Sequence, residues 1–440
     1  MKDSSDEEDL DMEPIVMVIL TMEIEKGAFA RFFAYRTGRF VGLFVCLNSI
    51  HEKMKKRFQR HSEHRTIKAM RVLVALSGGI DSSVVAYLLK RAGHELVAVR
   101  FLLWTDPLAP ALAEILPSKC CTTQNAMRAQ KVAETLSIPY HIVDLSEEFK
   151  SSVVDPYLES HRKGLTPNPC IGCNRTIKFG KLIELMREYG CEKLATGHYA
   201  RVAVEESASA AEVHEAPLRR CLLLEAVDKT KDQSYYLYGL SQEQLSHCLF
   251  PLGAMQKSQV YGLAKEFGVP FDDISYRESQ DLCFFPEKTP EEFLKRHLSD
   301  ALKPGPIVRR DGTVMGTHEG LALYTLGQRK GLGIGGLKIP LEVVEKRTQE
   351  NALVVADRGS EQVNDVTIGD IAWVSWKPEE SLEAPFECRT RSLSTKHRGV
   401  LSYSGTKGVF RLTTPLPPQS PGQALVLYRG EEIVGGGIIQ

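Results

Sequence analysis

The residues VALSGGIDSSVVAYLLKRAG, 74–93, place two glycines, several serines and one aspartate in a turn that directly follows an apolar run. The run RVLVAL predicts a buried strand, and the residues after the turn predict a helix. Gly78 and Gly79 have no Cβ atoms, so backbone N–H groups there can close around an oxyanion at the positive end of that helix. The serine hydroxyls add donors, and Asp81 can orient Mg²⁺ or a water on pyrophosphate. The turn therefore predicts a phosphate site.

The type of phosphate site follows from the residues beside the glycines. No lysine follows them, so the turn is not the GxxxxGK[ST] loop. The order SGGxDS instead resembles the PP-loop of ATP pyrophosphatases, which split ATP between its α and β phosphates. That resemblance implies ATP and Mg²⁺ as ligands. The alternative is a strand–turn–helix whose glycines serve only the turn.

Three cysteines form a second candidate site. TPNPCIGCNRTIKFG carries Cys170 and Cys173 in a C-x-x-C spacing, and Cys283 lies in RESQDLCFF. Asn-Pro before the first cysteine indicates a turn, and NRTIKFGKLIELM predicts a helix. Cys173 is therefore expected near a helix N-terminus, with Arg175 and Lys178 close by, and these conditions lower the pKa of a thiol.

Three kinds of site fit these cysteines. In the first, one cysteine carries sulfur as a persulfide and another resolves it by forming a disulfide bond. In the second, Cys170, Cys173 and Cys283 ligate an iron–sulfur cluster, such as [4Fe-4S], with an open position. In the third, the cysteines are buried as small apolar residues. The sequence does not separate the first two kinds of site, because they use the same residues.

The composition excludes several classes of protein. The chain has 440 residues, a net charge of −1 and ten cysteines. Global charge does not predict a nucleic-acid partner, so any RNA binding depends on local basic faces. The cysteine content is far below that of a disulfide scaffold and indicates a reducing, cytoplasm-like compartment. The longest early apolar run, IVMVIL, is too short for a membrane span.

The first 69 residues differ from the rest of the chain in their distribution of charged residues. Residues 1–14 contain seven acidic residues against one lysine, and residues 26–69 contain eleven Lys and Arg against two acids. An acidic start argues against an organellar transit peptide, which favours the cytoplasm and leaves the mitochondrion as the alternative. We expect residues 1–69 to be an atypical, poorly ordered extension or a misassigned start.

The remaining chain must position both candidate sites. Strands alternate with helices over residues 70–288, which predicts a doubly wound parallel sheet whose ligands bind at the carboxyl ends of the strands. Residues 289–362 are expected to form a small central domain that binds tRNA. Short strands separated by turns over residues 363–440 predict an antiparallel β-barrel.

Several motifs of this chain resemble, in order, those of the tRNA-specific 2-thiouridylases. They are SGGIDSSVVAYLL, TPNPCIGCNRTIKFG, ATGHYARV, DKTKDQSYYLYGLS, FPLG, ESQDLCFF, YTLGQRKGLGIGG and GGGII. The resemblance covers about residues 70–440. It implies an enzyme that activates the carbon-2 oxygen of the wobble uridine of tRNA with ATP, releases pyrophosphate, and delivers sulfur to give 2-thiouridine and AMP. It also implies an upstream persulfide-relay donor and no membrane partner.

The resemblance implies roles for individual residues. Cys283 matches the persulfide-bearing cysteine, and Cys173 matches the cysteine that attacks to release the sulfur. The ATP cradle corresponds to Ala75, Leu76, Ser77, Gly78, Gly79, Ile80, Asp81 and Ser82, with Leu102 and Gly197 as further contacts. The target base is expected at Asn168, Pro169 and Cys170, and tRNA at Lys231, Asp232 and Gln233.

One departure from the family pattern bears on the sulfur chemistry. Many members have Asp where this chain has Cys170, so the extra thiol strengthens the iron–sulfur alternative. Two further alternatives are an amidating PP-loop ligase and a non-catalytic, zinc-stabilised RNA-binding protein. The first needs no paired cysteines, and the second needs neither the serines nor Asp81 beside the glycines.

Overall fold

The computed structural model describes residues 69–110, 123–206, 219–271, 282–375 and 383–440, together with the backbone of three strands near the N-terminus. The chain divides into two compact units, residues 1–68 and residues 69–440. In the first unit the strands form an antiparallel sheet in the order β1-β2-β3. Their bounds are β1 (Met17–Met22), β2 (Phe29–Arg36) and β3 (Arg39–Cys46). That residues 1–69 are a poorly ordered extension or a misassigned start stays a prediction.

The second unit begins with a five-stranded sheet in the order β10-β7-β4-β5-β6, in which every neighbouring pair is parallel. The strands are β4 (Arg71–Ala75), β5 (Glu95–Leu102), β6 (Tyr140–Asp144), β7 (Lys193–Ala195) and β10 (Cys248–Leu249). The predicted parallel sheet is therefore confirmed. The predicted phosphate turn follows β4 directly, at the carboxyl end of the sheet, where ligands of such folds bind.

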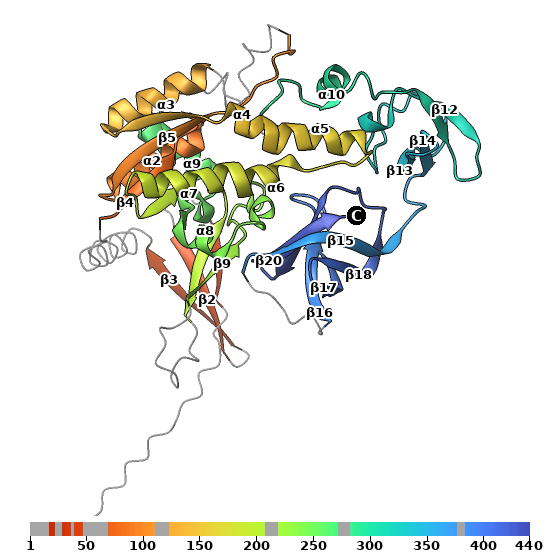
Figure 1. Ribbon diagram of the computed structural model, residues 1–440. Helices are drawn as coiled ribbons and strands as arrows, with labels where there is room; N and C mark the ends of the chain where they lie inside the picture. Colours follow the sequence, from red (N-terminus) through yellow and green to blue (C-terminus); the bar gives the residue numbers. More distant parts are fainter. Residues whose placement is uncertain are drawn as a thin grey trace, which may run out of the picture. The chain divides into compact units, whose positions relative to one another are not determined.

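Helices cover both faces of this sheet because its strands alternate apolar side chains between two cores. Val72 and Val74 of β4 belong to the core that contains α2 (Ile80–Arg91), α3 (Thr123–Leu136) and α9 (Lys257–Glu266). Leu73 belongs to the opposite core, with α7 (Phe179–Glu188). Figure 1 shows α2 and α3 on one side of the sheet and α7 on the other.

Two long helical runs carry the segments between these elements, and each contains a π-helical turn. The first is α4 (Ser146–Phe149), η2 (Lys150–Val154) and α5 (Asp155–Arg162), and the second is α6 (Pro169–Cys173), η3 (Asn174–Lys178) and α7. The shorter helices are η5 (Ser234–Leu237), α8 (Gln242–His247), η6 (Pro251–Ala254), α10 (Glu291–His297) and η7 (Leu321–Leu323). Among the described residues, no helix is long and apolar enough to cross a bilayer.

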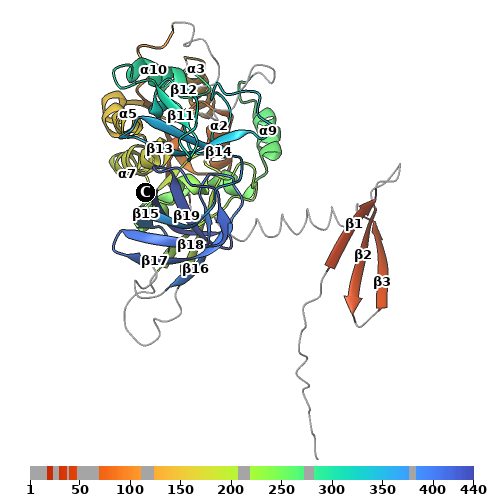
Figure 2. The same ribbon diagram turned by 90° about the vertical axis from the view of Figure 1, so that its right-hand side faces the viewer.

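Two further sheets follow along the chain. The first has the order β12-β11-β14-β13 and is built from β11 (Gly305–Val308), β12 (Val314–His318), β13 (Leu341–Arg347) and β14 (Ala352–Asp357). The second has the order β15-β18-β17-β16-β19-β20 and closes through a β15–β20 pairing, which confirms the predicted antiparallel barrel. Its strands are β15 (Val363–Trp373), β16 (Ala384–Arg389), β17 (His397–Ser404), β18 (Lys407–Leu416), β19 (Ala424–Arg429) and β20 (Glu432–Ile439). Figure 2 shows the barrel and the smaller sheet as separate layers.

The barrel is joined to the parallel-sheet domain by backbone pairing. The hairpin β8 (Arg201–Glu206) and β9 (Arg219–Leu224) extends the barrel sheet, because β9 pairs antiparallel with β20. A shared apolar core contains Leu73 and Phe179 of the parallel-sheet domain and Tyr428 and Ile433 of the barrel. The two domains therefore share one packed core, so a structural change in one domain can displace residues of the other.

Candidate active site

The predicted phosphate turn lies at the start of helix α2. The N-cap residue is Gly79, which has no side chain with which to cap the helix. Ser82 and Ser83 donate their hydroxyl protons to the Gly79 carbonyl, at 3.1 and 2.9 Å, and the Ser77 and Ser82 hydroxyl oxygens lie 3.1 Å apart. The start of α2, with the positive end of its dipole, is therefore a position that favours an anion.

Gly78 brings this turn against helix α3. Its φ is +84°, and a Cβ atom at this position would lie 1.9 Å from the Asn125 carbonyl oxygen. Arg128 fixes the contact, because its Nη1 donates to the Gly78 carbonyl and to Asn125 Oδ1, both at 2.8 Å. The glycine is thus required both for its backbone conformation and for a close approach.

A Gly78→Ala variant is expected to lose ATP binding and to be less stable than a Gly93→Ala variant. Gly93 has nearly the same φ, +86°, but nothing lies within 4 Å of a Cβ atom there. The Gly93 change measures the backbone penalty alone, about 1–2 kcal/mol, while Gly78→Ala adds a clash that displaces the turn or α3. Denaturant unfolding and ATP calorimetry check this, and equal results for the two variants would contradict a role for the close approach.

Most of the predicted ATP and tRNA residues meet in one cavity of about 300 Å³. The predicted residues that line it are Ala75, Leu76, Ser77, Gly79, Asp81, Ser82, Gly197, Lys231, Gln233 and Cys283. Ile80 instead lies in the apolar core, and Leu102 is 39% exposed at the end of β5, where its neighbour Leu103 lines the cavity. The cavity therefore joins the phosphate turn to one of the three candidate cysteines.

Asp81 has two partners in this cavity that the sequence analysis missed. Lys257 donates to both carboxylate oxygens of Asp81, at 2.7 and 2.9 Å, and the Tyr199 hydroxyl donates to Oδ1 at 2.9 Å. The Lys257 ammonium is largely buried and also lies over the Tyr199 ring, 5.4 Å from its centroid. Lys257 follows the FPLG motif, which is the sequence signal that could have found it.

His198 and Lys178 line the same cavity. Burial, and then the nearby Lys178 charge, lower the pKa of His198 to about 3. Its Nδ1 lies 2.8 Å from the Thr196 hydroxyl oxygen. His198 is therefore a neutral hydrogen-bonding group at physiological pH, and Lys178 supplies positive charge.

Cys173 and Cys283 belong to one apolar cluster. Cys173 is a buried member, and Cys283 packs against the cluster from the cavity side. Neither cysteine forms a disulfide bond, and nor does Cys170. One of the two thiols therefore reaches the ATP cavity, and the other is buried in the apolar cluster against which the first one packs.

The expected lowering of the Cys173 pKa is wrong. Helix α6 begins at Pro169, with Asn168 as its N-cap accepting from the Cys170 N–H at 3.2 Å, so Cys173 lies a full turn inside the helix. Burial raises the pKa of the Cys173 thiol to about 11, and the nearby Lys178 offsets only part of that rise. Local sequence predicted a thiol near a helix N-terminus with two cations close by, and long-range packing instead buries the thiol in an apolar pocket.

If Cys173 releases the sulfur, as the resemblance implies, that step is expected to accelerate with pH. Because the pKa of its thiol is raised to about 11, the thiolate fraction increases roughly tenfold per pH unit from about pH 7 to pH 9. Single-turnover formation of the thiolated product, measured by rapid quench with preloaded enzyme, should follow this slope while pyrophosphate release does not. A flat profile for product formation would remove Cys173 deprotonation from the slow step.

The three candidate cysteines do not fit an iron–sulfur cluster as they are arranged. No group of three His, Cys, Asp or Glu side chains able to hold a metal ion occurs among the residues described. Cys170 instead lies near the phenol groups of Tyr157 and Tyr236. The pKa of both phenols is raised, mainly by burial and further by the nearby Cys170.

A second, larger cavity of about 1030 Å³ contains other predicted residues. Asn168 and Pro169 line it, together with Arg175 and Arg187 of the second helical run and Trp373 of the barrel. This cavity lies where the parallel-sheet domain faces the barrel. It therefore offers cationic and aromatic groups beside the predicted target-base residues, a combination suited to unstacked RNA bases.

The predicted tRNA residues Lys231, Asp232 and Gln233 do not share one environment. Lys231 and Gln233 line the ATP cavity, but Asp232 is buried. The Asp232 carboxylate accepts from the Ala226 N–H at 2.9 Å and from the Ser234 hydroxyl at 2.9 Å. Burial raises its pKa. Its contact with tRNA stays a prediction, and in this structure the side chain supports the loop that carries its neighbours.

Comparison with known proteins agrees with the order of domains. Residues 70–287 match the family model described as a tRNA methyl transferase HUP domain, residues 291–357 a tRNA methyl transferase PRC-barrel domain, and residues 363–439 an aminomethyltransferase beta-barrel domain. The tRNA-specific 2-thiouridylase MnmA 1 of Caldanaerobacter subterraneus is 39% identical over 371 residues, covering 84% of this chain and 98% of that protein. The chain belongs to the tRNA-specific 2-thiouridylase family.

Other relatives and neighbours are consistent with this family membership. The tRNA-specific 2-thiouridylase MnmA of Chloroflexus aurantiacus is 40% identical over 369 residues, covering 84% of this chain and 98% of that protein. Among solved structures, the U34-tRNA thiolase NcsA of Methanococcus maripaludis with its [4Fe-4S] cluster covers 53% of this chain and 68% of its own, at 21% identity and a TM-score of 0.31. That last likeness is too low to bear on the sulfur chemistry of this 2-thiouridylase family member.

Proposed function

We propose that this protein is an ATP-dependent tRNA 2-thiouridylase that acts on the wobble uridine. The observation that carries the proposal is the shared cavity: the phosphate turn with Asp81, and Cys283, line the same space. The oxygen of a uracil carbonyl is a poor leaving group, so it must first be activated. Attack of that oxygen on the α-phosphate of ATP forms the adenylated base and releases pyrophosphate.

The residues of the cavity suit this first step. The start of α2 supplies N–H groups to phosphate oxygens, and Lys257 and Lys178 add positive charge. Mg²⁺ prefers oxygen ligands and is commonly held by one or two carboxylates together with substrate phosphates. Asp81, beside the Ser77 and Ser82 hydroxyls, fits that donor set, so we assign Asp81 to Mg²⁺·ATP. The ion would balance the charge of the triphosphate.

The second step delivers sulfur. An upstream persulfide-relay donor loads Cys283 as Cys283–S–S⁻, and the terminal sulfur bonds to carbon 2 of the uridine while AMP leaves. The Cys173 thiolate then attacks the sulfur of Cys283, which forms a Cys173–Cys283 disulfide and releases the base as 2-thiouridine. A thiol reductant supplies the two electrons that restore both cysteines. The location of both thiols in one apolar cluster supports this assignment.

The tRNA partner is assigned to the larger cavity and its rim. A base held in an anticodon loop must leave its stack before it reaches a buried thiol. We propose that Asn168 and Pro169, which line the larger cavity, receive that base together with their neighbour Cys170. Lys231 and Gln233 would contact the nucleotide from the ATP side. We place the reaction in the cytoplasm, where thiols stay reduced, with the mitochondrion as the alternative.

The test is to purify the protein anaerobically and to measure iron, acid-labile sulfide, pyrophosphate release and 2-thiouridine in bulk tRNA. Activity without iron supports the persulfide mechanism. Activity that rises and falls with about four irons per chain contradicts it and favours the cluster alternative. No 2-thiouridine with ATP and a sulfide source supplied contradicts the proposed substrate.

A further inference from the structure

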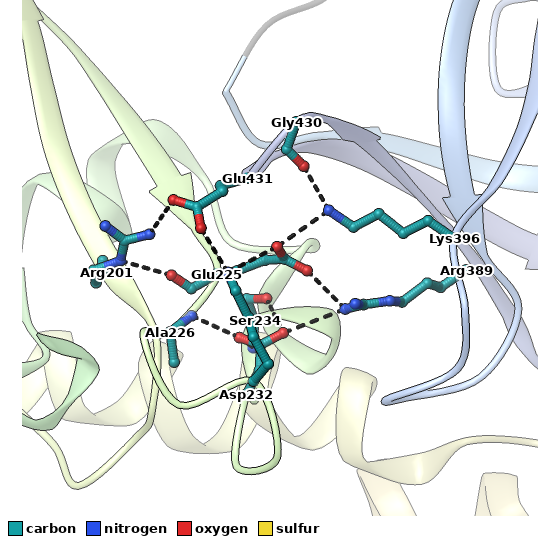
Figure 3. A network of polar contacts seen from close by, with 10 residues as sticks. Arg201, Glu225, Ala226, Asp232, Ser234, Arg389, Lys396, Gly430 and Glu431 are labelled. Atoms are coloured by element: carbon teal, nitrogen blue, oxygen red, sulfur yellow. Dashed lines mark hydrogen bonds and ion pairs between the residues drawn. The ribbon is translucent and has the colours of Figure 1, made fainter. Parts of the chain in front are cut away.

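An ionic network joins the barrel to the loop of residues 225–233, here called the 225–233 loop. Figure 3 shows Arg389 and Lys396 of the barrel directed at Glu225 and Asp232 of this loop. Arg389 Nη1 lies 2.8 Å from Glu225 Oε1 and 3.5 Å from Asp232 Oδ2, and Lys396 Nζ lies 3.1 Å from Glu225 Oε2. The carboxylates of Glu225 and Asp232 are 4% and 1% exposed. Buried carboxylates depend on such partners, because a lost partner leaves a charge without compensation.

The barrel cations are themselves held in place. Arg389 and Lys396 both lie over the Tyr428 ring, 5.1 and 4.4 Å from its centroid. Glu431, in the turn between β19 and β20, pairs with Arg201 at 2.6 Å and with Lys229 at 2.7 Å. The network therefore spans two barrel turns and the 225–233 loop; its Arg389, Lys396, Glu225 and Asp232 side chains are largely buried, and Glu431 and Lys229 lie at its exposed edge.

The same loop holds both partners of Asp81. Gln233 donates its N–H to the Tyr199 carbonyl at 2.8 Å and accepts the Tyr199 N–H at Oε1 at 2.9 Å. Asp228 Oδ2 accepts the Lys257 N–H at 2.9 Å. Tyr199 and Lys257 in turn hold the Asp81 carboxylate. A continuous set of bonds thus leads from the barrel, through the loop, to the phosphate turn.

We propose that Arg389 and Lys396 are positioning residues for the ATP site, so that the barrel fixes the geometry of Asp81, Lys231 and Gln233. Neither barrel residue lines the ATP cavity; both act through the 225–233 loop. This inference rests on the proposed function, since it takes the cavity as the ATP site. It assigns the barrel a part in the ATP step, in addition to any contact with tRNA.

The test measures the Kd of the full-length protein for α,β-methylene ATP with Mg²⁺ by calorimetry, at a temperature where circular dichroism shows each variant folded. Arg389→Met is expected to weaken binding on the order of tenfold, because misplaced site residues lose part of their interaction. Arg411→Met is the matched control: Arg411 is also a barrel arginine in an ion pair, with Asp365, but it is 70% exposed. It should bind like the wild type.

Two further variants separate positioning from simple stability. The interaction of Arg389 with the two carboxylates is mainly one of charge, because its Nη1 makes no well-directed hydrogen bond. A lysine carries the same charge, so Arg389→Lys should bind more tightly than Arg389→Met. Arg389→Met combined with Asp232→Asn removes the uncompensated charge and should also bind more tightly than Arg389→Met alone. A purely structural role would change the unfolding temperature without this pattern in Kd.

The outcomes are distinct for the two proposals. A folded Arg389→Met variant with wild-type Kd overturns the positioning role. If that variant does not fold, Lys396→Met decides instead, since Lys396 pairs with the same loop at Glu225, and wild-type Kd there overturns the role equally. A wild-type protein that does not bind the nucleotide contradicts the proposed function itself.

Discussion

A Cys283→Ser variant is expected to release pyrophosphate from ATP and tRNA at close to the wild-type rate and to form no 2-thiouridine. Serine has nearly the same shape, so the cavity and the phosphate turn stay intact. Its oxygen does not carry a transferable sulfur atom, so the second step stops. Mass spectrometry of digested tRNA measures the product, and a coupled phosphate assay measures pyrophosphate.

The matched control is Cys191→Ser. Cys191 is a buried cysteine that packs in the core beneath the parallel sheet and not in the cluster with Cys173 and Cys283. It should form 2-thiouridine normally. Thiolation by the Cys283→Ser variant would remove Cys283 from the proposed role.

The reaction of a Cys173→Ser variant should stop at a later step than that of Cys283→Ser. The persulfide sulfur of Cys283 can still bond to the activated base, but no thiolate releases it. Enzyme and tRNA should then remain joined through Cys283 in a species that dithiothreitol separates. Denaturing gels with and without reductant show this adduct, and its absence from Cys173→Ser would point to release of free sulfide before attack on the base.

The sequence predicted the elements that depend on local pattern. The run RVLVAL, the glycine turn and the following helix appear as β4 and α2, and short strands with turns appear as the barrel. These features follow from the alternation of apolar residues and from turn chemistry, which act within a few residues. The cavity that unites the turn with Cys283 also agrees with the motif order.

What the sequence did not predict depends on contacts between distant segments. The raised Cys173 pKa follows from burial in a cluster that also includes Tyr157, Phe284 and Phe285, from two other parts of the chain. Asp81 pairs with Lys257, 176 positions away, and Asp232 faces the barrel. No local rule places such groups together, because burial and charge pairing are decided only when the domains pack.

Replacement of Lys257, the partner of Asp81, is expected to have a large effect on the ATP step. The Lys257 ammonium is buried beside the phosphate turn, between the Tyr199 and Tyr261 rings at 5.4 and 5.1 Å, and so it is a fixed positive charge in the ATP cavity. Fixed charges in a site shielded from water stabilise the charge that develops on phosphate oxygens. Lys257→Met keeps the length of the side chain and removes that charge.

Lys257→Met is therefore expected to lower the rate of pyrophosphate release by about 10²–10³-fold. Lys265→Met on the same helix is the control, because Lys265 is exposed and lies outside the cavity. Since the variant also leaves Asp81 without its cation, Lys257→Met with Asp81→Asn tests whether the loss is only an uncompensated carboxylate. If the double variant is as fast as Asp81→Asn alone, Lys257 serves only to neutralise Asp81; if it is slower than Asp81→Asn alone, the ammonium acts on the phosphates directly.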